Sequence, residues 1–155
     1  MSSPDADRLT DRQSDLDPTK PIIFYDGVCG FCNRLVQLII KHDRHDQFRF
    51  ASLQSDFARD SLLPLGRNPD DLDSLYMIEH PGTDHPVVYS KSDVSIRVWP
   101  KLGGLWKLTA VLKIVPRPIR DLGYDFISSI RYRIWGKYDQ CLLPTPEQRE
   151  RFIEV

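Results

Sequence analysis

Two cysteines, Cys29 and Cys32, are separated by two residues and lie between segments of contrasting pattern. The preceding run, 22–25, is apolar with β-branched and aromatic residues, which predicts a buried strand. An Asp-Gly pair breaks this run with residues typical of turns. After the second cysteine, apolar residues recur at helical spacing, which predicts a helix with a broad buried face. A Cys-x-x-Cys between a strand and a helix is typical of a dithiol–disulfide redox site.

The start of a helix stabilises a thiolate, because its first N–H groups lack intrahelical partners and the helix dipole is positive there. The pKa of a cysteine in that position falls from about 8.5 toward neutrality. We therefore expect Cys29 to be the more exposed thiol and the nucleophile. Cys32, one turn further on, is expected to attack a mixed disulfide formed on Cys29. Asp26 is expected to accept or relay the proton of Cys32, with a purely turn-forming role as the alternative.

Two other interpretations of the cysteines stay open beside the redox one. The pair is either a zinc site completed by His42 and His45, or two ordinary core cysteines. The spacing from Cys32 to His42 is shorter than a usual zinc-finger linker, which favours two surface histidines. Cys141 either exchanges a disulfide with the pair or packs as a structural residue, and packing is favoured. No organic cofactor and no metal is expected, because two thiols carry the electrons themselves.

Composition narrows the class of protein. The chain has 155 residues, 21 Lys and Arg against 22 Asp and Glu, and a net charge of −1, so no charge excess favours nucleic acid. Three cysteines without an apolar leader argue against a disulfide-stapled secreted domain, so we expect a cytoplasmic protein. The sequence has no run of about 18 apolar residues, so it predicts no membrane-spanning helix. Residues 1–20 are polar and predict a flexible tail, and 21–155 predict one domain.

The order of the predicted elements indicates the fold class. Strands are expected at 22–25, 48–51, 75–79 and 87–89, and helices after 33, at 55–63, from 92, at 105–115, from 118 and from 147. This order predicts an α/β, thioredoxin-like fold, in which a parallel βαβ unit joins an antiparallel hairpin. We expect a central mixed sheet of about four strands, flanking helices and a C-terminal helical extension. The right-handed crossover then places the cysteines at the carboxyl edge of the first strand.

The C-terminal helical region is locally basic, with Arg117, Arg120, Arg131, Arg133 and Lys137. A solvated face with ion pairs is favoured over contact with an acidic partner, a glutathione carboxylate or anionic lipid. The spacing of apolar residues in 105–115 is interpreted as a helix packed on its own sheet. A segment lying on a membrane surface is the less favoured alternative.

Several separated segments carry a family resemblance. Residues 24–32 read Phe-Tyr-Asp-Gly-Val-Cys-Gly-Phe-Cys, and 92–93, 102–106, 115–121, 131–136 and 139–144 follow in order. These segments resemble the motifs of the DCC family of thiol-disulfide oxidoreductase-like proteins. Asp26, Cys29 and Cys32 match the Asp and two Cys for which that family is named. The resemblance spans residues 21 to 152 and implies a thioredoxin-like fold and thiol-disulfide oxidoreductase activity.

The expected partner is therefore a disulfide-containing protein or a small thiol substrate, with an unidentified reductant. Thioredoxins place a cis-proline just before their third strand, and the nearest proline here, Pro69, lies too far from Leu75. This departure argues against a thioredoxin-type substrate groove. The alternative function is a non-catalytic thioredoxin-like binding module or a redox sensor.

Overall fold

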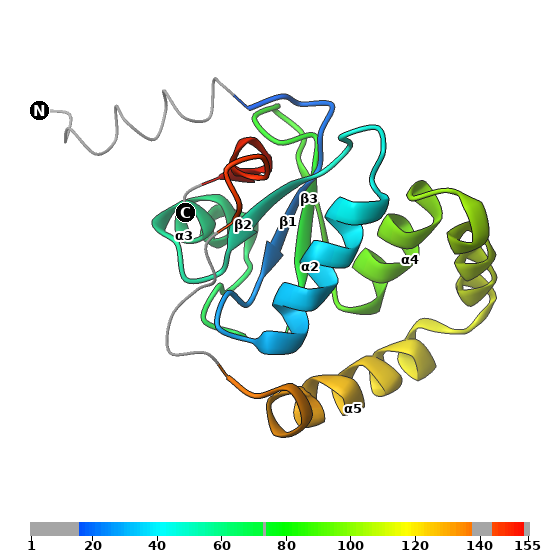
Figure 1. Cartoon of the computed structure of the whole chain (residues 1–155). Helices are drawn as coiled ribbons and strands as arrows, with labels where there is room; N and C mark the ends of the chain where they lie inside the picture. Colours follow the sequence, from blue (N-terminus) through cyan, green and yellow to red (C-terminus); the bar gives the residue numbers. More distant parts are fainter. Residues whose placement is uncertain (1–15, 73, 138–143, 154–155) are drawn as a thin grey trace, which may run out of the picture.

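The computed structural model describes residues 16–72, 74–137 and 144–153. In this part of the chain one mixed sheet has the strand order β4-β3-β1-β2-β5 (Figure 1). The strands are β1 (Ile22–Tyr25), β2 (Arg49–Ser52), β3 (Tyr76–Glu79), β4 (Val87–Ser90) and β5 (Phe152–Ile153). β2 is parallel to β1 and β5, whereas β3 is antiparallel to β1 and β4. The predicted α/β, thioredoxin-like fold is therefore confirmed.

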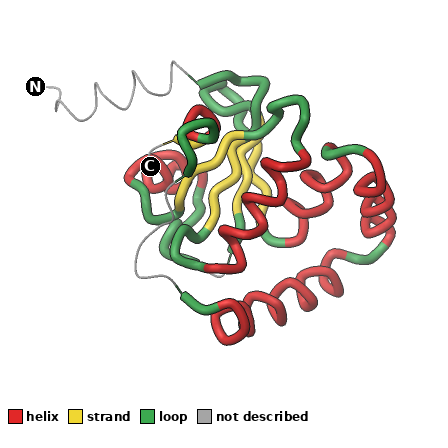
Figure 2. The backbone as a smooth tube through the Cα atoms, viewed as in Figure 1, coloured by secondary structure: helices red, strands yellow, loops and turns green. Residues whose placement is uncertain are grey.

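Helices cover both faces of the sheet (Figure 2). α2 (Gly30–His42) and α4 (Ser92–Lys101) lie on one face, where Ile23 and Tyr25 of β1 share a cluster with Val36 and Val98. α3 (Asp56–Leu62), followed by the short 3₁₀ helix η1 (Leu63–Leu65), lies on the other face, where Ile22 and Phe24 share a second cluster with Phe57. Side chains alternate between the faces of a strand, so a strand buried on both sides is apolar throughout.

The sequence missed the fifth strand. A charged helix was expected from Glu147, but the structure has a short 3₁₀ helix, η3 (Arg149–Arg151), followed directly by β5. The ring of Phe152 lies 5.6 Å from that of Phe50, and Arg151 pairs with the buried Asp43 at 3.3 Å. A two-residue strand is too short to leave an alternation pattern, so tertiary contacts decide its structure.

The N-terminal boundary lies among polar residues. Within the predicted tail, Leu16 packs against the cluster on the α3 side, and Lys20 pairs with Asp46 at 2.8 Å. Residues 1–15 lie outside the described residues, so the prediction of a flexible tail stays a prediction.

After α4 the chain forms η2 (Gly104–Ile114), a 3₁₀ helix, and α5 (Arg117–Trp135), which run along the outer edge of the molecule (Figure 1). We call these two elements together the C-terminal arm. Gly103 and Gly104 have φ of 79° and 57°, a left-handed conformation that separates η2 from α4. Trp106 stacks on Trp99 of α4 at 4.9 Å.

The expected packing of 105–115 on the sheet is wrong. Leu105, Leu108 and Ile114 are 83%, 68% and 81% exposed. A 3₁₀ helix has three residues per turn, so side chains at i and i+3 form a single row. Residues 105, 108, 111 and 114 therefore form one row, and this row faces outward. The α-helical spacing assumed from the sequence would have placed a different set of residues together.

Candidate active site

Cys29 is the last residue of the turn that joins β1 to α2, and it lies directly before the first residue of α2. Its backbone is extended, with φ −80° and ψ 119°, and its sulfur accepts the backbone N–H of Cys32 at 3.3 Å. A side-chain oxygen usually fills this capping role, so a sulfur here faces the unpaired N–H groups of the helix. The side-chain amide of Asn33 fixes the turn by donating to the carbonyls of Gly27 and Cys29 at 2.7 and 2.9 Å.

The exposure of the two thiols differs from the expected order. Cys29 is completely buried, whereas Cys32 is 8% exposed, so the prediction that Cys29 is the more exposed is wrong. The backbone of Lys137, just after α5, forms an isolated antiparallel bridge with Cys29. The end of α5 therefore lies against the start of α2, a contact that the sequence does not reveal. Both thiols are free, so the structure is the reduced form.

The two thiols have opposite proton affinities. The thiol of Cys32 donates a hydrogen bond to Cys29, which is the main cause that lowers the pKa of Cys29 to about 7. The backbone N–H of Cys32 and the charge of Arg131 lower this pKa further, against the effect of burial. The same hydrogen bond, with burial, raises the pKa of Cys32. The pair therefore holds its negative charge on Cys29 and its proton on Cys32 near neutral pH.

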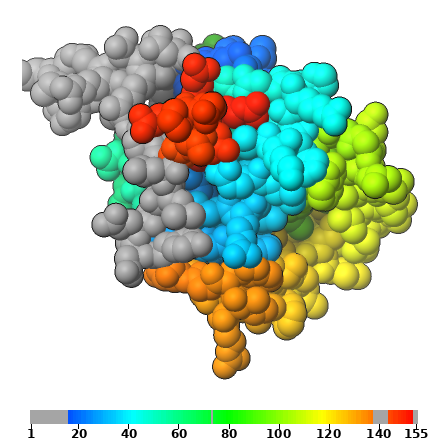
Figure 3. Space-filling view, viewed as in Figure 1, coloured from blue at the N-terminus to red at the C-terminus, as the bar shows by residue number. Residues whose placement is uncertain are grey.

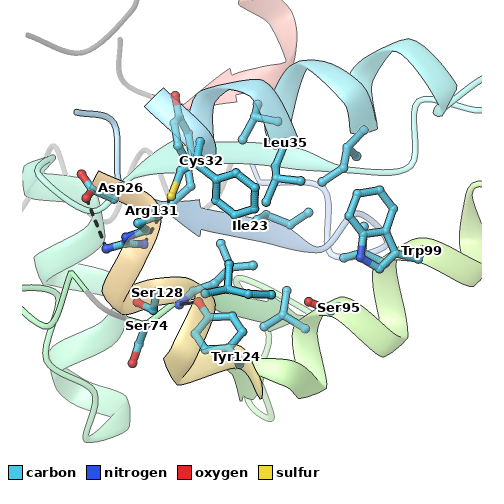
Figure 4. Close-up of a pocket in the computed structure, with 18 residues that line it drawn as sticks. Ile23, Asp26, Cys32, Leu35, Ser74, Ser95, Trp99, Tyr124, Ser128 and Arg131 are labelled. Carbon is cyan, nitrogen blue, oxygen red and sulfur yellow. Dashed lines mark hydrogen bonds and ion pairs between the residues drawn. The ribbon is translucent and has the colours of Figure 1, made fainter. Parts of the chain in front are cut away.

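Arg131, from α5, connects the thiols to Asp26. It is 4% exposed, its Nη1 donates to the sulfur of Cys32 at 3.3 Å, and its Nη2 lies 3.5 Å from Oδ2 of Asp26 (Figure 4). A solvated basic face was expected here, and for Arg131 that prediction is wrong. Arg117 and Arg120 do form ion pairs, with Asp93 at 3.2 and 3.3 Å.

Asp26 is buried among hydrogen-bond donors. Its Oδ1 accepts from Nε2 of Gln54 at 2.8 Å and from the backbone N–H of Val28 at 3.1 Å, while Oδ2 accepts from the hydroxyl of Tyr132. The hydrogen bonds described for this carboxylate reach neither sulfur, and Arg131 is its link to Cys32. Since every partner is a donor, the site suits a carboxylate that only accepts.

A cavity of about 220 Å³ lies beside Cys32, between β1, α2, α4 and α5 (Figure 4). Its walls are mostly apolar, including Phe31, Leu35, Val98 and Trp99, while Cys32, Asp26 and Arg131 meet at one end. Cys32 lines this cavity and Cys29 does not. Ser74 and Leu75, the residues just before β3, also line it, and the hydroxyl of Tyr124 accepts the N–H of Leu75 at 2.9 Å.

The structure thus brings Asp26, Cys29 and Cys32 together and adds four residues that sequence reasoning did not assign to the site: Gln54, Tyr124, Arg131 and Tyr132. Three polar residues of α5, Tyr124, Ser128 and Arg131, share one helical face at spacings of four and three. The sequence pattern of α5 could have pointed to these residues, because this polar face lies opposite the apolar stripe of the same helix.

The remaining candidates lie elsewhere or outside the described residues. Nδ1 of His42 lies 2.9 Å from the carbonyl of Leu38, and its ring meets Trp106 edge-on at 5.6 Å. Within the described residues, no three His, Cys, Asp or Glu side chains are grouped to hold a metal ion. Cys141 lies outside the described residues. In the same part of the chain, no helix is long and apolar enough to cross a membrane.

Comparison with known proteins agrees with this arrangement. The model of the family described as DCC1-like thiol-disulfide oxidoreductase matches residues 23–137. The chain belongs to the DCC1-like family. It is 39% identical over 132 residues to the uncharacterized protein YuxK of Bacillus subtilis. The aligned residues are 85% of this chain and 93% of that protein. It is 33% identical over 125 residues to a DCC family protein of Arabidopsis thaliana named as chloroplastic, covering 80% and 70%. No solved structure matches significantly.

Proposed function

We propose that this protein is a thiol-disulfide oxidoreductase in which Cys29 and Cys32 carry the two electrons. The observation that supports this most is the sulfur of Cys29 at the start of α2, with a pKa of about 7. A thiolate is the nucleophile in disulfide exchange, and the best attacking thiol has a pKa near the ambient pH. The description of the family names the same chemistry.

The reaction has two displacement steps. The thiolate of Cys29 attacks one sulfur of a substrate disulfide, a mixed disulfide forms, and one substrate thiolate leaves and takes a proton from solvent. Cys32 then gives up its proton to solvent and attacks the sulfur of Cys29, which forms the Cys29–Cys32 disulfide and releases the second substrate thiolate, and this thiolate takes up a proton from solvent. Two electrons pass from the dithiol to the substrate, and a thiol reductant must return the protein to its dithiol form.

Arg131 is assigned to the second step. Once Cys29 is in the mixed disulfide, its negative charge no longer holds the proton of Cys32. The guanidinium 3.3 Å from Cys32 then stabilises the thiolate that forms there. Asp26 acts as a positioning residue by holding Arg131. The sequence-based proposal that Asp26 itself relays the proton remains a prediction.

The cavity points to a class of substrate. A substrate that lies in this apolar space while Cys29 attacks its disulfide needs an apolar group beside its sulfurs, as in a lipoyl-type disulfide or a cystine flanked by apolar side chains. Glutathione disulfide is polar and charged, and it suits these walls less well. Because Cys29 is fully buried, its attack requires local opening, and the bridge to Lys137 is a contact that must loosen.

Thiol alkylation followed by mass measurement, with and without reductant, tests the redox pair. A reversible Cys29–Cys32 disulfide is expected, and thiols that stay reduced under oxidant would overturn the proposal. Turnover is then measured with lipoamide, glutathione disulfide and insulin, with Cys29→Ser as the control. Faster reduction of lipoamide than of glutathione disulfide is expected from the apolar cavity.

The burial of Cys29 favours one alternative, a redox sensor that cycles without turning over a substrate. A reversible disulfide with no turnover on any of the three substrates would support the sensor and reject the enzyme. The reduction potential of the pair gives the direction of electron flow. A value near about −270 mV indicates a reductant and one near about −120 mV an oxidant.

We also propose the cytoplasm as the compartment, because its glutathione and thioredoxin pools keep thiols reduced. The plant relative is named as chloroplastic, so related proteins are not confined to one compartment. Cell fractionation with an antibody against the native protein tests the location.

A further inference from the structure

The C-terminal arm carries most of the exposed apolar surface in the described part of the chain. Ten of the twelve exposed large hydrophobic side chains found there belong to it: Leu105, Leu108, Val111, Leu112, Ile114, Ile119, Leu122, Phe126, Ile127 and Ile134. Scattered single hydrophobic residues are normal on a protein surface, but a concentration on neighbouring elements marks an interaction surface. Figure 3 shows these elements, yellow to orange, at the outer surface of the molecule.

α5 is amphipathic in the reverse of the usual sense. Its buried residues are Ser128 and Arg131, which face the thiol site, whereas Ile119, Leu122 and Phe126 are 61%, 72% and 66% exposed. The three apolar positions follow spacings of three and four, so they form one stripe along the helix. A helix whose polar face is turned inward leaves its apolar face uncovered by the described part of the chain.

Basic side chains accompany this apolar surface. From Gly104 to Lys137 the sequence has seven Lys and Arg and two Asp, although the whole chain has a net charge of −1. Lys107, Lys113 and Arg133 are exposed, and the ion pairs of the described residues do not involve them. Their partner is therefore expected to be anionic as well as apolar.

We propose that the C-terminal arm docks on the surface of an anionic lipid bilayer. Such a surface supplies acyl chains for the exposed leucines, isoleucines and Phe126 and negative headgroups for the lysines. The sequence alone favoured packing of 105–115 on the sheet, and the observed exposure of these side chains removes the basis for that preference.

A second copy of the chain fits the same surface less well. In a two-fold dimer the same patch meets itself, so the net positive arms would be brought together. Like charges facing one another across an interface oppose association. An anionic bilayer matches both the apolar and the charged part of the arm, and it does not have this conflict.

Vesicle flotation of the full chain tests this inference. We use phosphatidylcholine vesicles and mixtures of phosphatidylcholine with phosphatidylserine, and we expect binding to the mixed vesicles that falls at high salt. Leu122→Ser with Phe126→Ser is expected to weaken this binding about tenfold or more, because the two changes remove apolar surface that the bilayer would bury. Leu63→Ser with Val87→Ser, two exposed positions outside the arm, is the matched control and should leave binding unchanged.

Charge reversal supplies a second, independent variant. Lys107→Glu with Lys113→Glu is expected to lower binding to the mixed vesicles about tenfold or more, since each change replaces a charge attracted to the anionic surface by one that is repelled. Lys41→Glu with Arg44→Glu, two exposed basic positions outside the arm, is the control with the same change of net charge. Disulfide exchange in solution should be unchanged in all these variants, which shows that they fold.

Three results would overturn the proposal. The first is no binding to either kind of vesicle, and the second is binding that neither pair of arm variants reduces. The third is a dimer in lipid-free solution, seen by sedimentation equilibrium and lost in the Leu122→Ser, Phe126→Ser variant, which would assign the arm to a second copy. None of these results bears on the proposed thiol chemistry, whose tests use soluble substrates.

Discussion

The two faces of α5 differ in polarity and in exposure, since the inner face is polar and buried and the outer face is apolar and exposed. The inner face places Arg131, a buried cation, between a carboxylate and a thiol, with Tyr124 and Ser128 beside it. The outer face leaves Leu122 and Phe126 more than half exposed. Burial of a charge is unfavourable unless it is paired, and exposure of apolar side chains gains nothing for the fold. Neither face is what stability alone would select, so both are better explained by function.

This difference between the two faces shows that the thiol site depends on a residue of the C-terminal arm. The cysteine pair comes from the β1–α2 turn, but the charge that stabilises Cys32 comes from about a hundred residues later in the chain. α5 is therefore a wall of the site and half of the candidate docking surface at once. Changes on its inner face should alter thiol chemistry and stability, whereas changes on its outer face should alter neither.

The largest effect is expected at the thiols. Cys29→Ser and Cys32→Ser should each reduce two-electron turnover to the uncatalysed background, because neither variant can form the intramolecular disulfide. Cys32→Ser should trap a mixed disulfide on Cys29, which mass spectrometry detects after non-reducing digestion. Trapping on Cys32 in the Cys29→Ser variant, with none in Cys32→Ser, would reverse the proposed order of attack and agree with the greater exposure of Cys32.

The next effect is on stability, at the buried charge pair. Asp26→Asn leaves the guanidinium of Arg131 without its buried counter-charge. Arg131→Met likewise leaves the carboxylate of Asp26 without its counter-charge. Each change should lower the free energy of unfolding by about 3–5 kcal/mol, the usual result of breaking a buried pair. Urea denaturation followed by tryptophan fluorescence measures the loss.

The double variant Asp26→Asn, Arg131→Met sharpens this test. Because it removes both charges, its loss of stability should be smaller than the sum of the two single losses. Additive losses would show that the two side chains do not interact across the 3.5 Å seen here.

The thiol motif was the part of the site most predictable from sequence. The apolar run, the Asp-Gly turn and the Cys-x-x-Cys are local, so pattern alone places Cys29 at the start of α2 and Asp26 at the end of β1. The order of strands and helices likewise indicated the α/β, thioredoxin-like fold. The start of α3 is also decided locally, because the hydroxyl of Ser55 accepts the N–H of Ala58 at 3.1 Å.

The remainder depended on contacts that local patterns do not encode. Arg131 and Cys32 meet across 99 positions of sequence, and a basic residue on a helix is more often solvated than buried. β5 has only two residues, and η2 adopts a 3₁₀ repeat where the leucine spacing resembled an α-helix. The exposure of Cys29 was misjudged because Lys137, far along the chain, pairs with it.

The pH dependence of alkylation should separate the two thiols. Carbamidomethylation of Cys29 should follow its thiolate, rising with pH through about 7 and levelling off above it, rather than rising through about 8.5 as for an ordinary thiol. Arg131→Lys keeps a positive charge but loses the planar donor pair, so it should raise this apparent pKa less than Arg131→Met does. A midpoint unchanged in both variants would remove the electrostatic role of Arg131.

The smallest effect is expected on the outer face of α5. Leu122→Ser should change the free energy of unfolding by no more than about 0.5 kcal/mol, because this side chain is 72% exposed and loses little contact on truncation. Ile23→Ala, in the core cluster on the opposite side of the site, is the matched control and should cost about 2–5 kcal/mol in the same urea titration. A loss for Leu122→Ser close to that of Ile23→Ala would mean that the outer face is covered in solution, and the contrast between the faces of α5 would then disappear.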